Sequence, residues 1–264
     1  MKIALTIAGS DSGGGAGIQA DLKTFAAHGV YGTSVITALT AQNTTGVKGV
    51  MEIEPSFVAL QMQAVLEDMD VAAIKIGMLS GSEIIRQVAL TLQDYPDIPV
   101  VLDPVMVAKS GDHLLQPEAR QALIDHLFPL ARVITPNLHE AGVITGSQVH
   151  DVESMQQAAR TIKSMGAGHV LVKGGHLPGD AVDLLFDGSG FVTFSAPRLS
   201  NKNTHGTGCT FSSAIAANLA GGLELKEAVQ RAKDYITGAV KNAFPVGKGV
   251  GPTHHFFNIA LRGV

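Results

Sequence analysis

The sequence has little charge, a single cysteine and no tryptophan, and each scarcity excludes a class of protein. Charged residues make up 16% of the 264 residues, against about 25% in an average soluble protein. The lone cysteine, Cys209, excludes a disulfide-bonded scaffold and favours a reducing compartment such as the cytoplasm. The aromatic residues are only three tyrosines and ten phenylalanines. We therefore expect an aliphatic core.

Nucleic acids and membranes are disfavoured as partners. The 19 Lys and Arg residues are outnumbered by 23 Asp and Glu residues, which gives a net charge of −4, and they form no basic cluster. No apolar run approaches the roughly 18 residues that a membrane span needs. The apolar start, Met1–Gly9, is too short for a signal-peptide core. These observations predict a cytoplasmic globular protein, and its 30 glycines point to an enzyme with loop-built sites.

Short apolar runs alternate with longer amphipathic runs along the chain. The short runs are rich in Val and Ile, as buried strands are; they are Ile3–Ile7, Ser34–Leu39, Val71–Ile76, Val100–Leu102, Val133–Thr135 and His169–Val172. The long runs predict helices; they are Ile18–His28, Pro55–Met69, Ser82–Leu92, Pro117–Leu127, Val152–Met165 and Glu224–Val240. This alternation predicts an α/β fold with a mostly parallel sheet between two helical layers, in one domain over residues 1–264.

One pair of runs breaks the alternation. Ala181–Phe186 and Phe191–Phe194 are separated only by Asp187–Gly190, which is typical of a β-hairpin. We therefore expect a small antiparallel pair at one edge of the sheet.

Polar and flexible residues follow each predicted parallel strand. Ligands of open α/β sheets bind at the carboxyl ends of the strands, so these segments mark the expected site. They are Gly9–Gly17, Ala41–Asn43, Gly77–Met78, Asp103–Met106, Pro136–Glu140 and Lys173–His176. The first of them lacks both the third glycine of a dinucleotide fingerprint and the Gly-Lys-Ser/Thr of a P-loop. It is either a loop that approaches a ligand closely or a tight strand–helix turn.

A second glycine-rich segment, Asn203–Thr210, leads directly into the helical pattern Phe211–Leu219. Gly206, Thr207 and Gly208 leave backbone N–H groups and the positive helix end exposed, which predicts an anion hole suited to phosphoryl transfer. An ordinary helix start capped by Thr207 is the alternative. Cys209 in the same turn is either a thiol of lowered pKa or a small inert residue.

Charged residues at the strand ends are candidate phosphate and metal ligands. Asp103 ends a strand near the anion hole and is a candidate for Mg²⁺. Lys173, beside two glycines, has the character of a phosphate-binding point charge. Glu140 lies three residues after Asn137, and for this residue taken alone a capping box is favoured over a metal role. The adjacent histidines 254 and 255 have no third ligand at useful spacing and receive no metal role.

Six separated segments, in order, resemble one family. They are Ala8–Asp21, Thr40–Thr44, Lys75–Leu79, Asp103–Met106, Val172–His176 and His205–Thr210. With these the chain resembles the ribokinase-type small-molecule kinases and, over nearly its whole length, their bacterial branch of hydroxymethylpyrimidine/phosphomethylpyrimidine kinases of thiamine biosynthesis. The resemblance implies a ribokinase-like fold, a homodimer, and an enzyme that uses ATP and Mg²⁺ to phosphorylate 4-amino-5-hydroxymethyl-2-methylpyrimidine and then its monophosphate.

The resemblance also implies roles for individual residues. Gly206–Cys209 would stabilise the transferring phosphoryl group and Lys173 would bind the triphosphate. Asn137 and Thr210 would lie on the ATP side, and Asp103 and Glu140 would organise Mg²⁺, partly through water. The residues expected near the pyrimidine are Gly9, Asp21, Gln42, Met78 and Val105. The Gln42 amide offers a donor beside an acceptor, which complements the amino group and ring nitrogen of a 4-aminopyrimidine.

The chain departs from most ribokinase-type enzymes at Cys209, which stands where they carry an aspartate as general base. This departure is typical of the pyrimidine-kinase branch and disfavours a sugar or nucleoside kinase. A pyridoxal/pyridoxine kinase of the same branch and a non-catalytic pyrimidine-binding sensor stay open as alternatives. Lys109–Asp112 is a candidate lid.

Overall fold

The computed structural model describes residues 1–106, 117–175 and 177–259, and the candidate lid Lys109–Asp112 lies outside these ranges. The described residues contain one sheet of nine strands in the order β3-β2-β1-β4-β5-β6-β7-β8-β9. The pairs from β2 to β7 are parallel, and β3, β8 and β9 pair antiparallel. The strands are β1 (Ile3–Asp11), β2 (Tyr31–Asn43), β3 (Gly46–Glu52), β4 (Val71–Ile76), β5 (Val100–Leu102), β6 (Val133–Ile134), β7 (Val170–Gly174), β8 (Ala181–Phe186) and β9 (Phe191–Ala196).

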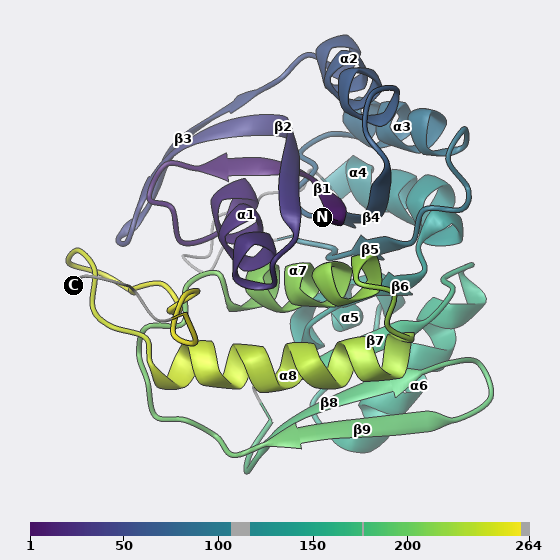
Figure 1. The fold of residues 1–264 in the computed structure, drawn as a ribbon. Coiled ribbons are helices and arrows are strands. Elements are labelled where there is room, and N and C mark those ends of the chain that lie inside the picture. The colour runs from purple at the N-terminus through teal and green to yellow at the C-terminus, as the bar shows by residue number, and fades with distance from the viewer. Residues whose placement is uncertain (107–116, 176, 260–264) are drawn as a thin grey trace.

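Helices cover both faces of this sheet, as the sequence predicts (Figure 1). One layer consists of α1 (Gly17–Ala27), α7 (Thr207–Ala220) and α8 (Leu225–Lys241). The other consists of α2 (Pro55–Leu66), α3 (Ser82–Leu92), α4 (Pro117–Ala122), α5 (Leu138–Thr145) and α6 (Val152–Ser164). Among the described residues, none of the helices is both long enough and apolar enough to cross a bilayer.

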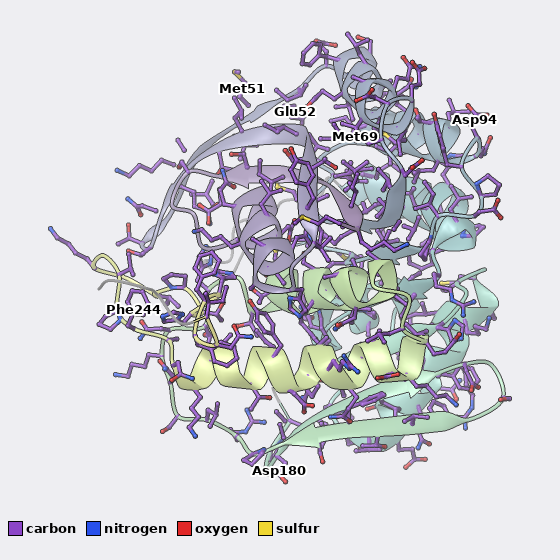
Figure 2. All side chains as sticks on the ribbon, in the orientation of Figure 1. Met51, Glu52, Met69, Asp94, Asp180 and Phe244 are labelled. Atoms are coloured by element: carbon purple, nitrogen blue, oxygen red, sulfur yellow. The ribbon has the colours of Figure 1, made fainter. Side chains whose placement is uncertain are left out.

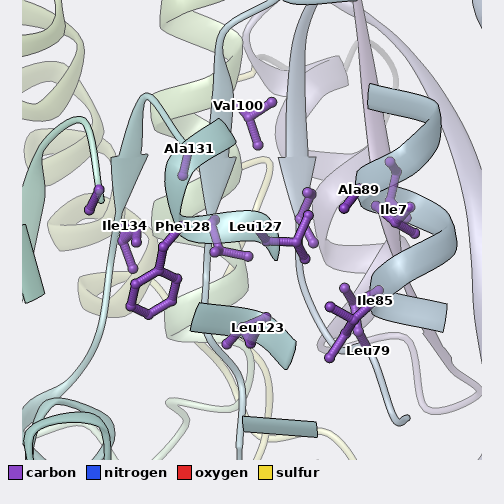
Figure 3. Close-up of a cluster of buried hydrophobic side chains, with 14 of the residues drawn as sticks. Ile7, Leu79, Ile85, Ala89, Val100, Leu123, Leu127, Phe128, Ala131 and Ile134 are labelled. Carbon is purple, nitrogen blue, oxygen red and sulfur yellow. The ribbon is translucent and has the colours of Figure 1, made fainter. Parts of the chain in front are cut away.

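Alternate residues of each central strand enter two separate cores. In β1, Leu5 packs beneath the α2–α6 layer, whereas Ala4 faces α1 and α7. In β5, Val100 and Leu102 join the first core and Val101 the second. Figure 3 shows part of the first core, where aliphatic side chains surround Phe128. The residues that fill both cores are mainly aliphatic, as the scarcity of aromatic residues predicts.

The structure differs from the sequence prediction at the edges of the sheet and at several element ends. The expected hairpin is present as β8 and β9. A second antiparallel strand, β3, covers the opposite edge, and the sequence missed it because its residues are exposed or half-buried and lack an apolar alternation. β1 and β2 continue four residues beyond their predicted ends. The helix predicted over Pro117–Leu127 ends at Ala122 and continues as a wider π turn.

The order of the strands creates a crevice beside β1. This strand lies between β2 and β4, so the chain leaves it first to one side and later returns on the other. Ligands of open α/β sheets bind at such a switch point, outside the carboxyl ends of the strands.

Candidate active site

A cavity of about 740 Å³ follows the carboxyl edge of the sheet from β2 to α8. We call its part beside β1, β2 and β4 the glycine-loop end, lined by Gly9, Gln42, Met78, Val105 and Cys209. We call the opposite part the α8 end, lined by Pro197, Leu199, Ile236, Thr237 and Val240. The start of α7 lies between the two ends. The sequence predicted this edge as the site because polar segments follow the strands there.

Close packing between two loops fixes the start of α7. Gly206 is the N-cap residue with φ +75°, a left-handed conformation that favours glycine. A Cβ atom at Gly206 would lie 1.8 Å from the backbone oxygen of Gly15, so the two glycine-rich segments pack directly on each other. The helix begins at Thr207, four residues before the predicted start, and the alternative in which Thr207 caps the helix is wrong because Gly206 is the N-cap residue. The Thr207 hydroxyl instead donates to the Thr204 carbonyl at 2.6 Å.

Lys173 and Asp103 face this helix start from β7 and the end of β5. A Cβ atom at Gly208 would lie 3.4 Å from Lys173 Nζ and 3.5 Å from Asp103 Oδ2, so glycine keeps the approach open. First-turn N–H groups have no acceptor within their own helix. The N-terminal end of α7 and the Lys173 ammonium therefore lie beside each other, and their use as an anion hole stays a prediction.

Asp103 and Lys173 form a buried ion pair at 2.7 Å. Burial favours the neutral acid, but the charges of Lys173 and Lys75 and the hydrogen bonds from Lys173 and Thr135 hold the pKa of Asp103 below its ordinary value. Burial likewise opposes the charge of Lys173, but Asp103 and Glu140 raise its pKa above the ordinary value. Both groups are therefore charged at neutral pH.

Glu140 closes a capping box at the start of α5, so the structural interpretation of this residue is confirmed. Glu140 N donates to Asn137 Oδ1 at 2.9 Å, and Asn137 N donates to Glu140 Oε2 at 2.7 Å. Both residues also line the cavity. Burial, and next the negative charge of Asp103, raise the pKa of Glu140 to about 7, although Lys173 opposes this shift.

Cys209 lies half-buried on the cavity wall within the first turn of α7. Burial raises the pKa of its thiol to about 11, and Asp21 and Asp103 add to the rise while Lys75 opposes it. Of the two interpretations left open by the sequence, the structure favours the protonated thiol. On the order of one molecule in 10⁴ carries the thiolate at pH 7, so a general-base role for Cys209 is disfavoured.

Four of the predicted acceptor residues line the glycine-loop end of the cavity. Gly9 packs against Met78, and a Cβ atom at Gly9 would lie 3.0 Å from Met78 Sδ. Gln42 at the end of β2 and Val105 after β5 complete this wall. The structure thus brings these residues together, and their binding of an acceptor stays a prediction.

Two of the predicted residues do not line the cavity, and the structure corrects their placement. Thr210 is fully buried, with its hydroxyl 3.3 Å from Thr253 Oγ1 and 3.1 Å from His255 Nε2. Asp21 is also fully buried. Its carboxylate is engaged by Lys75, by Thr6 at 2.6 Å and by Ser213 at 2.6 Å.

Sequence reasoning missed several charged residues of the cavity. Lys75 lies beneath the wall with its ammonium 2.8 Å from Asp21 Oδ2. At the α8 end, Lys233 pairs with Asp183 at 2.7 Å and joins α8 to β8. Both lysines interrupt buried apolar patterns, the same signal that singled out Lys173. His205 and its partner Asp11 gave no comparable signal, because 194 residues separate them.

The sheet order and the site at the switch point are those of the ribokinase-like α/β fold, which solved relatives share. A pyridoxal kinase of Bacillus subtilis, solved as an ADP complex, superposes with a TM-score of 0.91 at 44% identity, covering 97% of this chain and 98% of that one. The family model for phosphomethylpyrimidine kinase matches residues 11–254. The chain belongs to the phosphomethylpyrimidine kinase family.

Curated relatives agree with this family. The hydroxymethylpyrimidine/phosphomethylpyrimidine kinase of Rhizobium meliloti is 56% identical over 258 residues, which cover 96% of this chain and 97% of the relative. The thiamine biosynthesis bifunctional protein ThiED of Geobacter sulfurreducens is 56% identical over 252 residues. Those residues cover 95% of this chain, but the chain spans only about half (51%) of that longer protein.

Proposed function

We propose that this protein transfers the γ-phosphoryl group of ATP to the hydroxymethyl oxygen of 4-amino-5-hydroxymethyl-2-methylpyrimidine, and then phosphorylates the monophosphate to the diphosphate, in thiamine biosynthesis. The observation that carries this proposal is the convergence of Lys173 and the start of α7 in the middle of the cavity. A phosphoryl group held there has room for a donor on one side and an acceptor on the other. The family and the curated relatives support the same chemistry.

Phosphoryl transfer requires positioning and charge stabilisation more than covalent chemistry from the protein. The N–H groups of Gly206–Cys209 would stabilise the charge on the moving group, and Lys173 would hold the triphosphate. The apolar wall of the α8 end suits a nucleotide base, and Asn137 lies on the path between the two ends. The protonated Cys209 thiol would act as a weak donor to the acceptor oxygen or the phosphoryl group.

The residues present fit a Mg²⁺ ion that arrives with ATP. Asp103 and Glu140 are both buried and both lie close enough to Lys173 to raise the pKa of its ammonium group, so two carboxyl groups are available beside one lysine. Carboxylate oxygens and nucleotide phosphates are the ligands that Mg²⁺ prefers. When bound, the ion would neutralise the phosphate oxygens, and Asp103 and Glu140 would hold it directly or through water.

A pyridoxal kinase is the second candidate, because a pyridoxal kinase is among the solved structures that superpose closely. A coupled ADP-release assay with the aminopyrimidine, pyridoxal and pyridoxine as acceptors separates the two. The proposal predicts that kcat/KM is highest for the aminopyrimidine, with two ADP released per acceptor consumed. A preference of more than tenfold for pyridoxal would refute it, and binding of the aminopyrimidine without ADP release would indicate a sensor.

We further propose a cytoplasmic homodimer. Support for the dimer comes from large apolar side chains left exposed on neighbouring elements: Leu39, Val50 and Met51 on β2 and β3, and Phe57 and Leu60 on α2. Figure 2 shows the Met51 side chain pointing outward from β3. Exposed apolar patches of this kind are typical of protein interfaces. Sedimentation equilibrium tests this, and a monomer at micromolar concentration would contradict it.

A further inference from the structure

His205 connects the two glycine-rich segments at the glycine-loop end. Its side chain is 16% exposed, and its Nε2 atom lies 2.9 Å from Asp11 Oδ2. The Asp11 carboxylate also accepts backbone N–H groups from Gly13 at 2.8 Å, Gly15 at 3.0 Å and Ala16 at 2.9 Å. A Cβ atom at Gly15 would lie 2.4 Å from His205 Cδ2. The first glycine loop is therefore folded around the Asp11–His205 pair.

The Asp11 carboxylate determines which nitrogen of His205 carries hydrogen. Burial opposes the negative charge, but the hydrogen bonds from His205 and the loop backbone hold the pKa of Asp11 below its ordinary value. An ionised carboxylate only accepts hydrogen bonds. His205 Nε2 therefore carries a hydrogen and donates it to Asp11, and the same nitrogen has no lone pair with which to accept another hydrogen bond.

Gln42 lies between this donor and a second fixed group, Thr40. The amide nitrogen of Gln42 lies 3.3 Å from His205 Nε2, and its oxygen lies 3.3 Å from Thr40 Oγ1. Thr40 has one hydroxyl hydrogen, which it donates to the Ser10 carbonyl at 2.9 Å. Two donors thus face each other at His205 and two acceptors at Thr40. A half-turn of the Gln42 amide replaces both mismatches with hydrogen bonds. His205 Nε2 then donates to the amide oxygen and to Asp11 in a three-centre bond, and the amide nitrogen donates to Thr40 Oγ1.

We propose that His205, held by Asp11, is a specificity-determining residue that fixes the Gln42 amide with its oxygen toward His205. This inference rests on the proposed function and names what the same site selects. Two hydrogen-bonding positions of the amide are then used by the protein, and one acceptor and one donor position are left for a ligand. The free acceptor lies on the His205 side, next to Gly206 and the start of α7.

This arrangement selects an acceptor by the group at ring position 4. The 5-hydroxymethyl group must point toward the start of α7, so the neighbouring 4-substituent meets the amide oxygen. A 4-amino group donates to that oxygen, and ring nitrogen 3 accepts from the amide nitrogen. The 4-formyl oxygen of pyridoxal can only accept, so it faces another acceptor. The 4-hydroxymethyl group of pyridoxine can rotate and donate, so pyridoxine does not meet this mismatch.

The test measures kcat/KM for the aminopyrimidine, pyridoxal and pyridoxine in the wild type and in His205→Leu, with His205→Gln as the variant that restores a donor. Replacement of the exposed His126 by leucine is the matched control. We expect His205→Leu to lower the preference for the aminopyrimidine over pyridoxal at least tenfold, because the amide is then free to rotate. The preference over pyridoxine should change less than threefold, and His205→Gln and His126→Leu should retain the wild-type ratios.

A fall of less than tenfold in His205→Leu, an equal fall in His205→Gln, or an equal fall against pyridoxine would each overturn the proposal. A purely structural role for His205 lowers all three kcat/KM values together and leaves their ratios unchanged. If His205→Leu fails to fold, Thr40→Val removes the other anchor of the amide, with Thr40→Ser as its control, and the same thresholds apply. The wild-type ratio by itself tests the proposed function, whereas the change in ratio on substitution tests the role of His205.

Discussion

Replacing Lys75 by methionine is expected to destabilise the protein strongly, because it leaves the Asp21 carboxylate buried without a counter-charge. The side chains of both residues are 0% exposed. The ammonium lies 2.8 and 3.0 Å from the two carboxylate oxygens, and after its removal the hydroxyl groups of Thr6 and Ser213 still donate hydrogen bonds to Asp21. Removing one partner of a buried pair costs about 3–5 kcal/mol.

This cost is measurable as a thermal shift. One kcal/mol lowers Tm by roughly 2–4 °C in a chain of 150–250 residues, so Lys75→Met should lower Tm by roughly 6–20 °C. Adding Asp21→Asn removes the uncompensated charge and should recover a large part of the loss. The exposed pair Arg231–Glu227 provides the control, because its side chains are 59% and 51% exposed. Such pairs contribute less than about 1 kcal/mol.

Circular dichroism melts and urea titrations of the four proteins of this double-mutant cycle, together with Arg231→Met, test the reasoning. A coupling free energy near zero between Lys75 and Asp21 would refute it. So would a Tm loss in Lys75→Met that is no larger than that in Arg231→Met. Either result would mean that the pair beneath the cavity does not join β4 to α1 energetically.

Four further predictions concern the cavity. Gly206→Ala should lower Tm and kcat far more than Gly29→Ala, because a Cβ atom at Gly206 would meet the Gly15 carbonyl. Gly29 is the control, since it has a similar positive φ of +69° but open space around it. Equal effects of the two substitutions would contradict the packing of the two loops. The rate at which iodoacetamide alkylates Cys209, the sole cysteine, should still rise with pH above pH 10, because the raised pKa keeps the thiol protonated until the pH nears 11. A rate that reaches its plateau by pH 8.5 would contradict this. Cys209→Ala should retain kcat within about threefold, since loss of a general base costs 10²–10⁴, and a larger loss would restore the base hypothesis. Asp103→Asn should raise the half-saturating Mg²⁺ concentration at least about fivefold, the cost of about 1 kcal/mol of binding; an unchanged titration would count against its metal role.

The central architecture could be predicted because its signals are local. The buried strand β5 is a continuous apolar run, β4 is one interrupted by Lys75, and α3 and α6 show apolar residues at helical spacing, so each element is visible in its own residues. The anion hole was visible because glycines precede a helical run. Its start was misplaced because glycine disfavours helix locally, and the contact of Gly206 with Gly15 is a tertiary effect.

The remaining site features depend on residues that are distant in the sequence. Asp21 has the pattern of a surface helix residue, and only the folded chain shows that Lys75, 54 positions later, draws it into the interior. The raised pKa of Cys209 follows from burial and from the carboxylates of Asp21 and Asp103, which outweigh Lys75 and the backbone hydrogen bond of Gly17. The sequence around Cys209 does not by itself decide whether its side chain is a thiol or a thiolate. The pairing of His205 with Asp11 is likewise invisible before the two loops are packed together.

Phosphoryl transfer beside Lys173 is tested by the kcat/KM of Lys173→Met for the aminopyrimidine, compared with that of Lys2→Met, which removes an exposed lysine outside the cavity. If the phosphoryl group is transferred between Lys173 and the start of α7, loss of this ammonium should lower kcat/KM by about 10²–10³. Thermal melts should show that the variant is folded, and Lys2→Met should match the wild type. A folded Lys173→Met variant that retains activity within threefold of the wild type would contradict the account.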